Sequence, residues 1–256
     1  DPTHSKEFTG VKETMAFLLK YRRPILVILL CLLALGLRIR FLYGKPRIDG
    51  DEIYQVSLMT GSFGEMIRNL PHQEHCSYLS GDYLLIYPFY KMFGENKWGL
   101  AIPHLLITLI GLYFLYLLAK QYLKSLWGFL ITFGIVAFNR SLIEHSVEVR
   151  TYAVLPTLAI MSLYFSEVLA VNFETLRRVQ KVAMGAFFVV VLWFHVYGIV
   201  IVSTAVLYSL LSRRADQPIF KTLLKRFAKY FGVVFLAAMP LWCWSIFGPH
   251  VSYSRT

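Results

Sequence analysis

The chain has 256 residues, of which 57% are hydrophobic and only 16% are charged. Soluble domains carry about one quarter charged residues, so this much apolar surface cannot be buried in one soluble core. The formal net charge of +11 does not indicate nucleic acid, because the basic residues lie in short clusters between apolar runs and not on one solvated face. That spacing is typical of a membrane protein whose cytoplasmic loops collect Lys and Arg.

The sequence predicts an all-α, polytopic transmembrane bundle of about seven spans, since a helix needs about 20 apolar residues to cross a bilayer. The predicted spans are residues 24–43, 99–119, 126–138, 151–171, 182–195, 198–211 and 229–248. Residues 24–248 would thus form one membrane module. We expect residues 1–23 to be a cytoplasmic tail, with a tag remnant before Met15, and residues 249–256 to be an outer tail.

The fifth and sixth spans come from one unbroken apolar stretch, residues 182–211. As a single helix it would be about 45 Å long, which exceeds a hydrocarbon core of about 30 Å. Arg177 and Arg178 precede the stretch and Arg213 follows it, so both ends are predicted to be cytoplasmic. The chain must therefore turn back near His195.

With the amino terminus in the cytoplasm, most acidic residues fall on the outer side, many of them in a long first outer loop, residues 44–98. A loop of this length is expected to contain structure of its own. Apolar residues at helical spacing predict an amphipathic helix in the membrane interface. They are Ile53, Val56, Phe63, Met66, Ile67 and Leu70. Residues 83–93 predict a second such element, bent at Pro88.

Three carboxylates, Asp49, Asp51 and Glu52, stand within one helical turn just after the first span. Crowded carboxylates near a low-dielectric interface are suited to accept a proton from a hydroxyl group. The alternative interpretation is helix capping, since acids favour a helix amino terminus and Gly50 supplies a turn.

A second polar cluster, at the outer mouth of the fourth span, contains Glu148, Arg150 and Tyr152. A guanidinium can hold a phosphate oxygen through two hydrogen bonds, and Tyr152 could add a third donor. Alternatively, Arg150 reaches lipid headgroups or pairs with Glu148. His195 and Tyr197, in the predicted outer turn, are interpreted as pocket lining, because a lone histidine in a helical bundle is more often a packing residue than a catalyst.

Metal binding has little support from the sequence. His72, His75 and Cys76 carry donor atoms that suit zinc, but no second pair at a standard spacing accompanies them, so we predict no metal ligands there. A divalent cation held by oxygen atoms of the two outer acidic clusters stays an open alternative.

The order and placement of these segments resemble the amino-terminal membrane module of the GT-C glycosyltransferases, in particular the branch of protein O-mannosyltransferases and aminoarabinose transferases. Asp51 and Glu52 follow the first span, and residues 93–98 lead into the second. Residues 148–152 are similar to the family's acidic-x-Arg-x-Tyr segment, and residues 195–197 resemble its His-x-Tyr turn.

The resemblance implies transfer of a sugar from a polyprenyl or dolichyl phosphate, with inversion, at the outer face of a bacterial or archaeal plasma membrane or the lumenal face of the endoplasmic reticulum. Asp51 and Glu52 would be the catalytic residues, with Asp51 taking the proton of the acceptor hydroxyl, and Arg150 and Tyr152 would hold the leaving phosphate. The other expected substrate-binding residues are Asp49, Glu148, His195 and Tyr197. The acceptor, whether protein, lipid or glycan, is left open.

Relatives of this kind carry further spans and usually a soluble carboxy-terminal domain, so we expect this chain to be truncated after Thr256. Two other classes of function remain alternatives: a lipid or solute transporter or flippase, and a noncatalytic membrane subunit. A transporter would need polar residues within its spans, whereas the mid-span stretches contain almost none apart from Glu167. The distribution therefore favours chemistry at the membrane surface.

Overall fold

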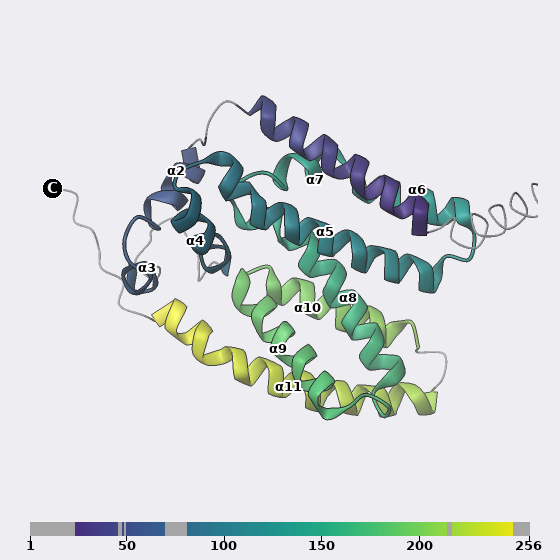
Figure 1. Ribbon diagram of the computed structural model, residues 1–256. Coiled ribbons are helices and arrows are strands. Elements are labelled where there is room, and N and C mark those ends of the chain that lie inside the picture. The colour runs from purple at the N-terminus through teal and green to yellow at the C-terminus, as the bar shows by residue number, and fades with distance from the viewer. Residues whose placement is uncertain (1–23, 46–47, 49, 70–80, 214–216, 248–256) are drawn as a thin grey trace, which may run out of the picture.

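The structure is a computed structural model that describes residues 24–45, 48, 50–69, 81–213 and 217–247. Nearly all of these residues are helical, and no strand occurs among them. In chain order the helices are Pro24–Gly44 (the first helix), α2 (Gly50–Ser57), α3 (Phe63–Asn69), α4 (Gly81–Phe93), α5 (Lys97–Tyr122), α6 (Leu126–Ala137), α7 (Arg140–His145), the 3-10 turn η2 (Thr151–Ala153), α8 (Leu155–Asn172), α9 (Arg178–Phe194), α10 (Gly198–Leu211) and α11 (Gln217–Phe247). The predicted all-α bundle is confirmed (Figure 1).

In the part of the chain that the structure describes, four helical segments are long and apolar enough to cross a membrane: Pro24–Gly44, Lys97–Tyr122, Thr151–Asn172 and Pro218–Cys243. Leu126–Ala137 and Gly198–Leu211 are shorter apolar helices. Each predicted span coincides with a helix, but within the described residues only four of these helices have the length and composition of a membrane span, so the predicted number of seven stays a prediction.

The predicted reversal near His195 is confirmed, because α9 ends at Phe194 and α10 begins at Gly198. The turn is tight, and Gly198 lies against the backbone of the preceding helix. A Cβ atom on Gly198 would lie 2.0 Å from the carbonyl oxygen of Val191. Only glycine fits this turn without movement of the backbone.

Replacing Gly198 with alanine is therefore expected to destabilise the α9–α10 hairpin by about 1–3 kcal/mol, the usual cost of overpacking. Thermal unfolding of the protein in detergent, followed by light scattering or tryptophan fluorescence, should show a lower transition temperature. Gly36→Ala is the matched control, since a Cβ atom at Gly36 has no other atom within 4 Å. Equal transition temperatures for the two variants would contradict the expected clash.

Helix α11 begins at Gln217, well before the predicted start of the last span at residue 229. The predicted span covers only the later part of this helix, because the basic residues before it end the apolar run without ending the helix. One face stays apolar throughout, and its members are buried against α8, α9 and α10. These are Leu223, Phe227, Phe231, Val234 and Ala238. The first third of α11 is thus amphipathic and the remainder apolar.

The first outer loop contains two short helices in place of the single amphipathic helix predicted from Ile53 to Leu70. α2 ends at Ser57 and α3 begins at Phe63, where a reciprocal pair of hydrogen bonds between Ser62 and Glu65 starts the second helix. The Ser62 amide donates to Glu65 Oε2 at 2.6 Å, and the Glu65 amide donates to Ser62 Oγ at 3.3 Å. This capping box gives α3 its own amino terminus. The second predicted element is confirmed as α4, which contains Pro88.

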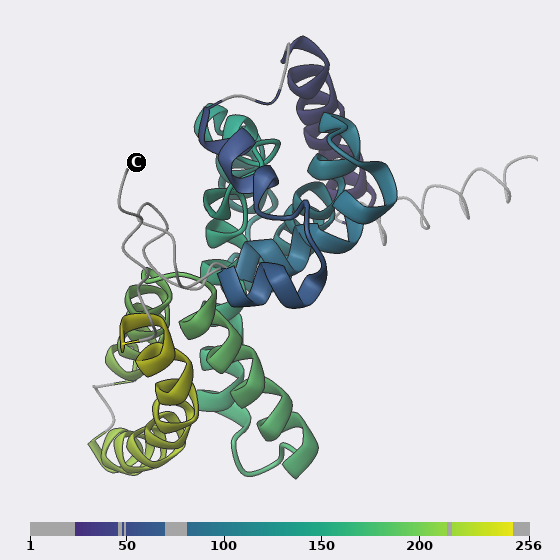
Figure 2. The ribbon, with the colours of Figure 1, turned by 90° about the vertical axis from the view of Figure 1, so that its left-hand side faces the viewer.

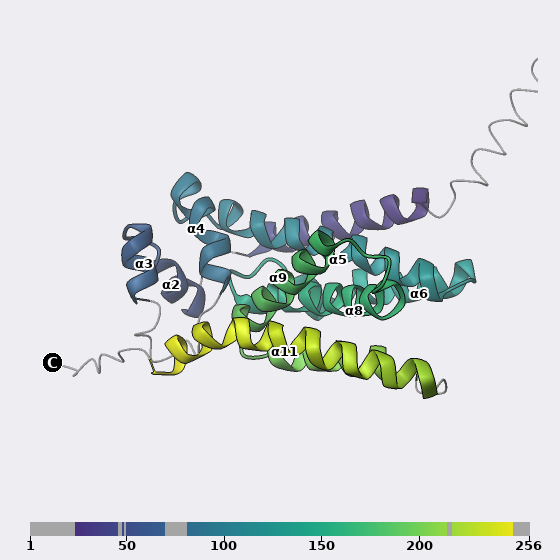
Figure 3. The same ribbon diagram turned by 90° about the horizontal axis from the view of Figure 1, so that it is seen from below.

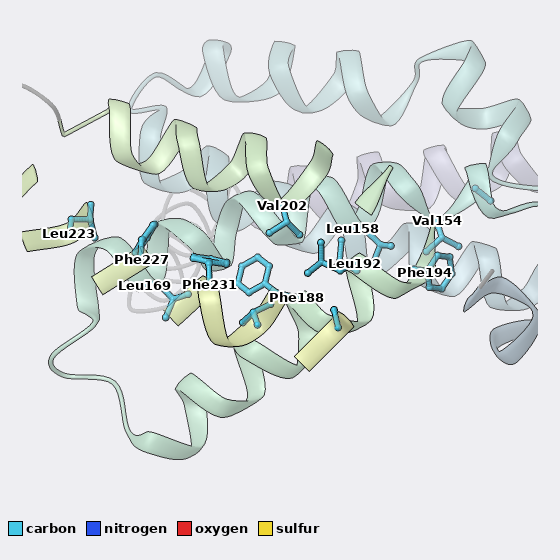
Figure 4. Packing of buried hydrophobic residues seen from close by; sticks show 14 residues of the cluster. Val154, Leu158, Leu169, Phe188, Leu192, Phe194, Val202, Leu223, Phe227 and Phe231 are labelled. Atoms are coloured by element: carbon cyan, nitrogen blue, oxygen red, sulfur yellow. The ribbon is translucent and has the colours of Figure 1, made fainter. Parts of the chain in front are cut away.

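Two large clusters of buried apolar residues hold the bundle together. One joins the first helix to α5 and α6 around Ala34, Leu112 and Phe133. The other joins α8 to α9, α10 and α11, where Phe188, Leu192 and Phe231 interdigitate (Figure 4). Figures 1 and 2 show the first helix and α11 on opposite sides of the molecule, and Figure 1 shows α5 and α8 between them.

Helices α2, α3 and α4 gather at one end of the bundle, here called the α2–α4 end (Figures 1 and 3). The segment between α7 and η2 reaches the same end, since the Val149 amide donates to Glu52 of α2 at 2.6 Å. The turn after α9 does too, because a Cβ atom on Gly81 of α4 would meet the ring of Phe194 at 2.3 Å. The fold therefore brings together the segments that carry the predicted site residues.

Candidate functional site

A cavity of about 750 Å³ lies between the first helix and the segment that follows α7. Its wall combines three basic side chains, one acidic side chain and several apolar ones. The lining residues are Leu37, Arg40, Phe41, Gly44, Lys45, Ile143, Glu148 and Arg150. A pocket with an apolar wall and a few convergent charged groups is a typical ligand site, and these charges favour an anionic ligand.

Two predicted site residues, Glu148 and Arg150, line this cavity. Arg150 occupies the N-cap position of η2 in an extended conformation, with φ −146° and ψ 150°. The Glu148 carboxylate lies 2.9 Å from Nδ1 of His145, the last residue of α7. This contact holds the carboxylate at the cavity wall. The cavity thus places a guanidinium and a carboxylate side by side.

Arg40 and Lys45 line the opposite wall of the cavity and were not predicted as site residues. Four of the lining residues lie on one face of the first helix, because they are spaced three or four positions apart along it. They are Leu37, Arg40, Phe41 and Gly44. That spacing was visible in the sequence, where it indicates a face with a single cation near the end of the span.

Glu52, one of the two predicted catalytic acids, is 1% exposed and holds α2 in place. Its Oε1 atom accepts hydrogen bonds from Lys45 Nζ and from the Val149 amide, each at 2.6 Å. The same carboxylate therefore ties α2 to both walls of the cavity. This arrangement suits Glu52 to a positioning role more than to direct contact with substrate.

Asp51 directly precedes Glu52 in the first turn of α2, which places its backbone beside the cavity wall. Gly50 opens the helix with φ +33°, in the left-handed region that favours glycine, as the predicted turn requires. The side chain of Asp51 and the whole of Asp49 lie outside the described residues.

Tyr152, His195 and Tyr197 form a row of rings at the same end of the bundle. The Tyr152 and His195 ring centroids are 5.9 Å apart, and the His195 and Tyr197 rings stack at 5.0 Å. Both tyrosines are exposed, whereas His195 is half-buried. The predicted site residues Tyr152, His195 and Tyr197 are thus brought together.

The protonation of His195 follows from its surroundings. Its Nδ1 atom accepts a hydrogen bond from the Tyr197 amide at 3.2 Å, so the neutral ring carries its proton on Nε2. Burial lowers the pKa of His195, and the nearby charge of Asp82 opposes this shift only in part. A neutral His195 therefore presents one N–H donor near neutral pH.

Arg38 is a further buried cation of the first helix that the sequence interpretation overlooked. It is 3% exposed, and its Nη1 atom donates to the carbonyl oxygens of Ala34 at 2.9 Å and Ala137 at 3.0 Å. Ala137 ends α6, so Arg38 caps a helix carboxy terminus, where a cation is favourable. Arg38 and Arg40 thus lie on different faces of the first helix. Arg38 stabilises the end of α6, whereas Arg40 lines the cavity.

Glu167, the polar residue expected to stand out within the spans, forms an ion pair near the far end of α8. Its two oxygens accept from Arg213 at 3.2 and 2.9 Å, and Tyr122 donates to the same carboxylate. The group is internally satisfied and links α5, α8 and the end of α10. It therefore gives no support to a polar path across the bundle.

Within the described residues, no three His, Cys, Asp or Glu side chains come together as a candidate metal site. His72, His75 and Cys76 lie outside the described part of the chain, as does Asp49. The open alternative of a divalent cation at the acidic clusters is therefore untested for Asp49 and Asp51.

Comparison with known proteins adds one match. The family model described as dolichyl-phosphate-mannose-protein mannosyltransferase matches residues 82–244. This range includes Arg150, Tyr152, His195 and Tyr197, whereas the first helix and α2 precede it. No curated protein and no solved structure matches the chain. Since the match spans α4 to α11, the chain belongs to the dolichyl-phosphate-mannose-protein mannosyltransferase family, a group of GT-C membrane glycosyltransferases.

Proposed function

We propose that this chain transfers a sugar from a polyprenyl- or dolichyl-phosphate donor to an acceptor hydroxyl, with inversion of the anomeric carbon, at the outer or lumenal face of its membrane. One observation above all supports the proposal. A single cavity collects Arg40 and Arg150 beside the short helix that begins at Gly50 and carries Asp51.

The cavity has the two properties that a lipid-phosphate donor requires. Arg40 and Arg150 offer planar guanidinium groups that can hold phosphate oxygens through paired hydrogen bonds. Leu37, Phe41 and Ile143 offer an apolar surface for the first isoprene units. The donor would lie with its phosphate between the first helix and η2.

The chemistry proposed for this site is a single displacement. The acceptor oxygen attacks the anomeric carbon while the bond from that carbon to the phosphate oxygen breaks, and the bonding electrons remain on the phosphate. Arg150 and Arg40 stabilise the charge that grows there. Asp51 takes the proton from the attacking hydroxyl. Glu52 keeps α2 against both cavity walls through Lys45 and Val149.

The sugar itself would lie toward the aromatic row. Tyr152 and Tyr197 present exposed rings, and His195 Nε2 offers a hydrogen-bond donor between them. Aromatic rings with polar tips suit a ligand that has both C–H faces and hydroxyl groups. Glu148, held by His145, completes the polar wall beside Arg150.

The distribution of basic residues supports an outer or lumenal site. Lys120, Lys124, Arg178 and Arg213 lie at helix ends away from the α2–α4 end. Cytoplasmic loops collect Lys and Arg, so the α2–α4 end would face the opposite side, with the amino terminus in the cytoplasm.

The proposal is tested with the whole chain in lipid nanodiscs, supplied with radiolabelled dolichyl-phosphate-mannose and membranes as a source of acceptors. We expect label to move into products that survive mild acid, because a glycoside is more stable to acid than a sugar phosphate. The nucleotide sugar GDP-mannose in the same assay should give no such product. Transfer from GDP-mannose alone would overturn the lipid-donor proposal, and labelled donor that neither binds nor reacts would favour a noncatalytic subunit.

A further inference from the structure

Asp82, at the start of α4, is a fully buried carboxylate at the α2–α4 end, with 0% of its surface exposed. Each of its oxygens accepts one hydrogen bond. Gln55 Nε2 donates to Oδ2 at 2.7 Å, and His104 Nε2 lies 2.8 Å from Oδ1. The three side chains come from α2, α4 and α5, so Asp82 is the centre of a contact that joins three helices.

Gln55 connects this contact to the proposed site. It lies one turn after Asp51 in α2, is 7% exposed, and shares the helix with Glu52. α2 has only eight residues, and a helix of this length is not stable by itself in water. Its position must therefore come from tertiary contacts.

Hydrogen bonds of the described residues hold α2 at two points, in addition to the apolar packing of Val56 in a cluster with Tyr83 and Leu100. Glu52 binds Lys45 and the Val149 amide near the amino end of the helix, and Gln55 binds Asp82 one turn later. Two anchors on successive turns fix both the location and the rotation of a short helix. Without Gln55, α2 would keep Glu52 and the non-directional packing of Val56, and would lose its second directional contact.

His104 of α5 contacts the second oxygen of Asp82. It is 0% exposed, and its Nδ1 atom has no hydrogen-bond partner within the described residues. An Nδ1 atom without a proton is tolerated more easily there than a buried N–H group without an acceptor, so we assign the proton to Nε2, directed at Asp82. Gln55 and His104 then both donate to the Asp82 carboxyl group.

We propose that Asp82, held by His104, is a positioning residue for sugar transfer that sets the place of Asp51 at the cavity by binding Gln55. The effect of Asp82 on sugar transfer rests on the proposed function, whereas its effect on the position of α2 does not. The contact itself can be tested without any assay of transfer. Because a misplacement of about 1 Å can lower a rate by about a hundredfold, loss of one of two anchors is expected to lower kcat by about tenfold.

The experiment compares Asp82→Ala, Gln55→Leu and the double variant in the intact chain. The kcat for transfer from dolichyl-phosphate-mannose should fall about tenfold in each single variant. It should fall no further in the double variant, since each single substitution already removes the same contact between Asp82 and Gln55. The donor Kd should stay within about twofold, because Arg40 and Arg150 are untouched. His104→Gln, which keeps an N–H donor, should restore much of the rate lost in His104→Phe. Gln121→Leu, at an exposed position of α5, is the matched control.

Amide hydrogen exchange measured by mass spectrometry gives the independent readout. Residues 50–57 should exchange faster in Asp82→Ala than in the wild type, whereas α11 should not change. Unchanged exchange in residues 50–57 would overturn the anchor, and faster exchange with unchanged kcat would overturn its role in the reaction. If Asp82→Ala does not fold, Gln55→Leu decides both points. Absence of transfer by the wild type would count against the proposed function, while the exchange measurement would still decide whether Asp82 anchors α2.

Discussion

Replacing Asp51 with asparagine is expected to lower sugar transfer by at least about a hundredfold, the usual scale for the loss of a general base. Asparagine has nearly the same shape as aspartate but cannot take a proton from the attacking hydroxyl. The donor Kd should change little, because the phosphate is proposed to bind Arg40 and Arg150. Single-turnover transfer from radiolabelled dolichyl-phosphate-mannose separates the rate of the chemical step from donor binding.

Glu95→Gln is the matched control for this variant, since it removes one exposed carboxylate from the same outer loop. Its transfer rate should equal that of the wild type. Undiminished transfer by Asp51→Asn would remove Asp51 from the mechanism and leave Glu148, on the cavity wall, as the carboxylate to test next. Glu52→Gln should also reduce the rate, but with faster amide exchange in α2, since Glu52 binds both Lys45 and Val149.

The helix pattern could be predicted where charge and apolar length act together. The turn at His195 followed from an apolar run too long for one span with Arg residues at both ends, and the structure places it there. The start of α11 was missed because the same criterion ends a span at the first charges. Leu223 and Phe227 continue the buried face through that basic segment. Hydropathy marks the apolar part of a helix and not its beginning.

The candidate site was predictable only in part, because its residues come from separate segments. Arg150 and Tyr152 could be selected from local spacing at the mouth of a span. The anchoring of Glu52 to the Val149 amide, and the contact between Asp82 and Gln55, depend on tertiary placement that no local pattern contains. Arg40 was overlooked because a single cation at the end of a span is expected in any membrane helix.

The second large effect is expected at Arg150. Arg150→Gln should weaken binding of the donor and of its product, dolichyl phosphate, by about 30-fold, which corresponds to the roughly 2 kcal/mol of a charge-assisted hydrogen bond. Arg150→Lys keeps the charge but loses the planar pair of donors, so its affinity should fall between those of the wild type and Arg150→Gln. Binding of radiolabelled dolichyl phosphate to the protein in nanodiscs measures all three.

Arg140→Gln is the matched control, because Arg140 is also a cation near the α7 segment but its side chain is 91% exposed and pairs with Glu144. Its affinity for dolichyl phosphate should equal that of the wild type. Free dolichol, which lacks the phosphate, should bind Arg150→Gln and the wild type equally. If Arg150→Gln loses affinity for dolichol and dolichyl phosphate to the same extent, Arg150 shapes the apolar wall and does not hold the phosphate. A loss confined to dolichyl phosphate would instead identify this guanidinium as one of the groups that hold the leaving phosphate.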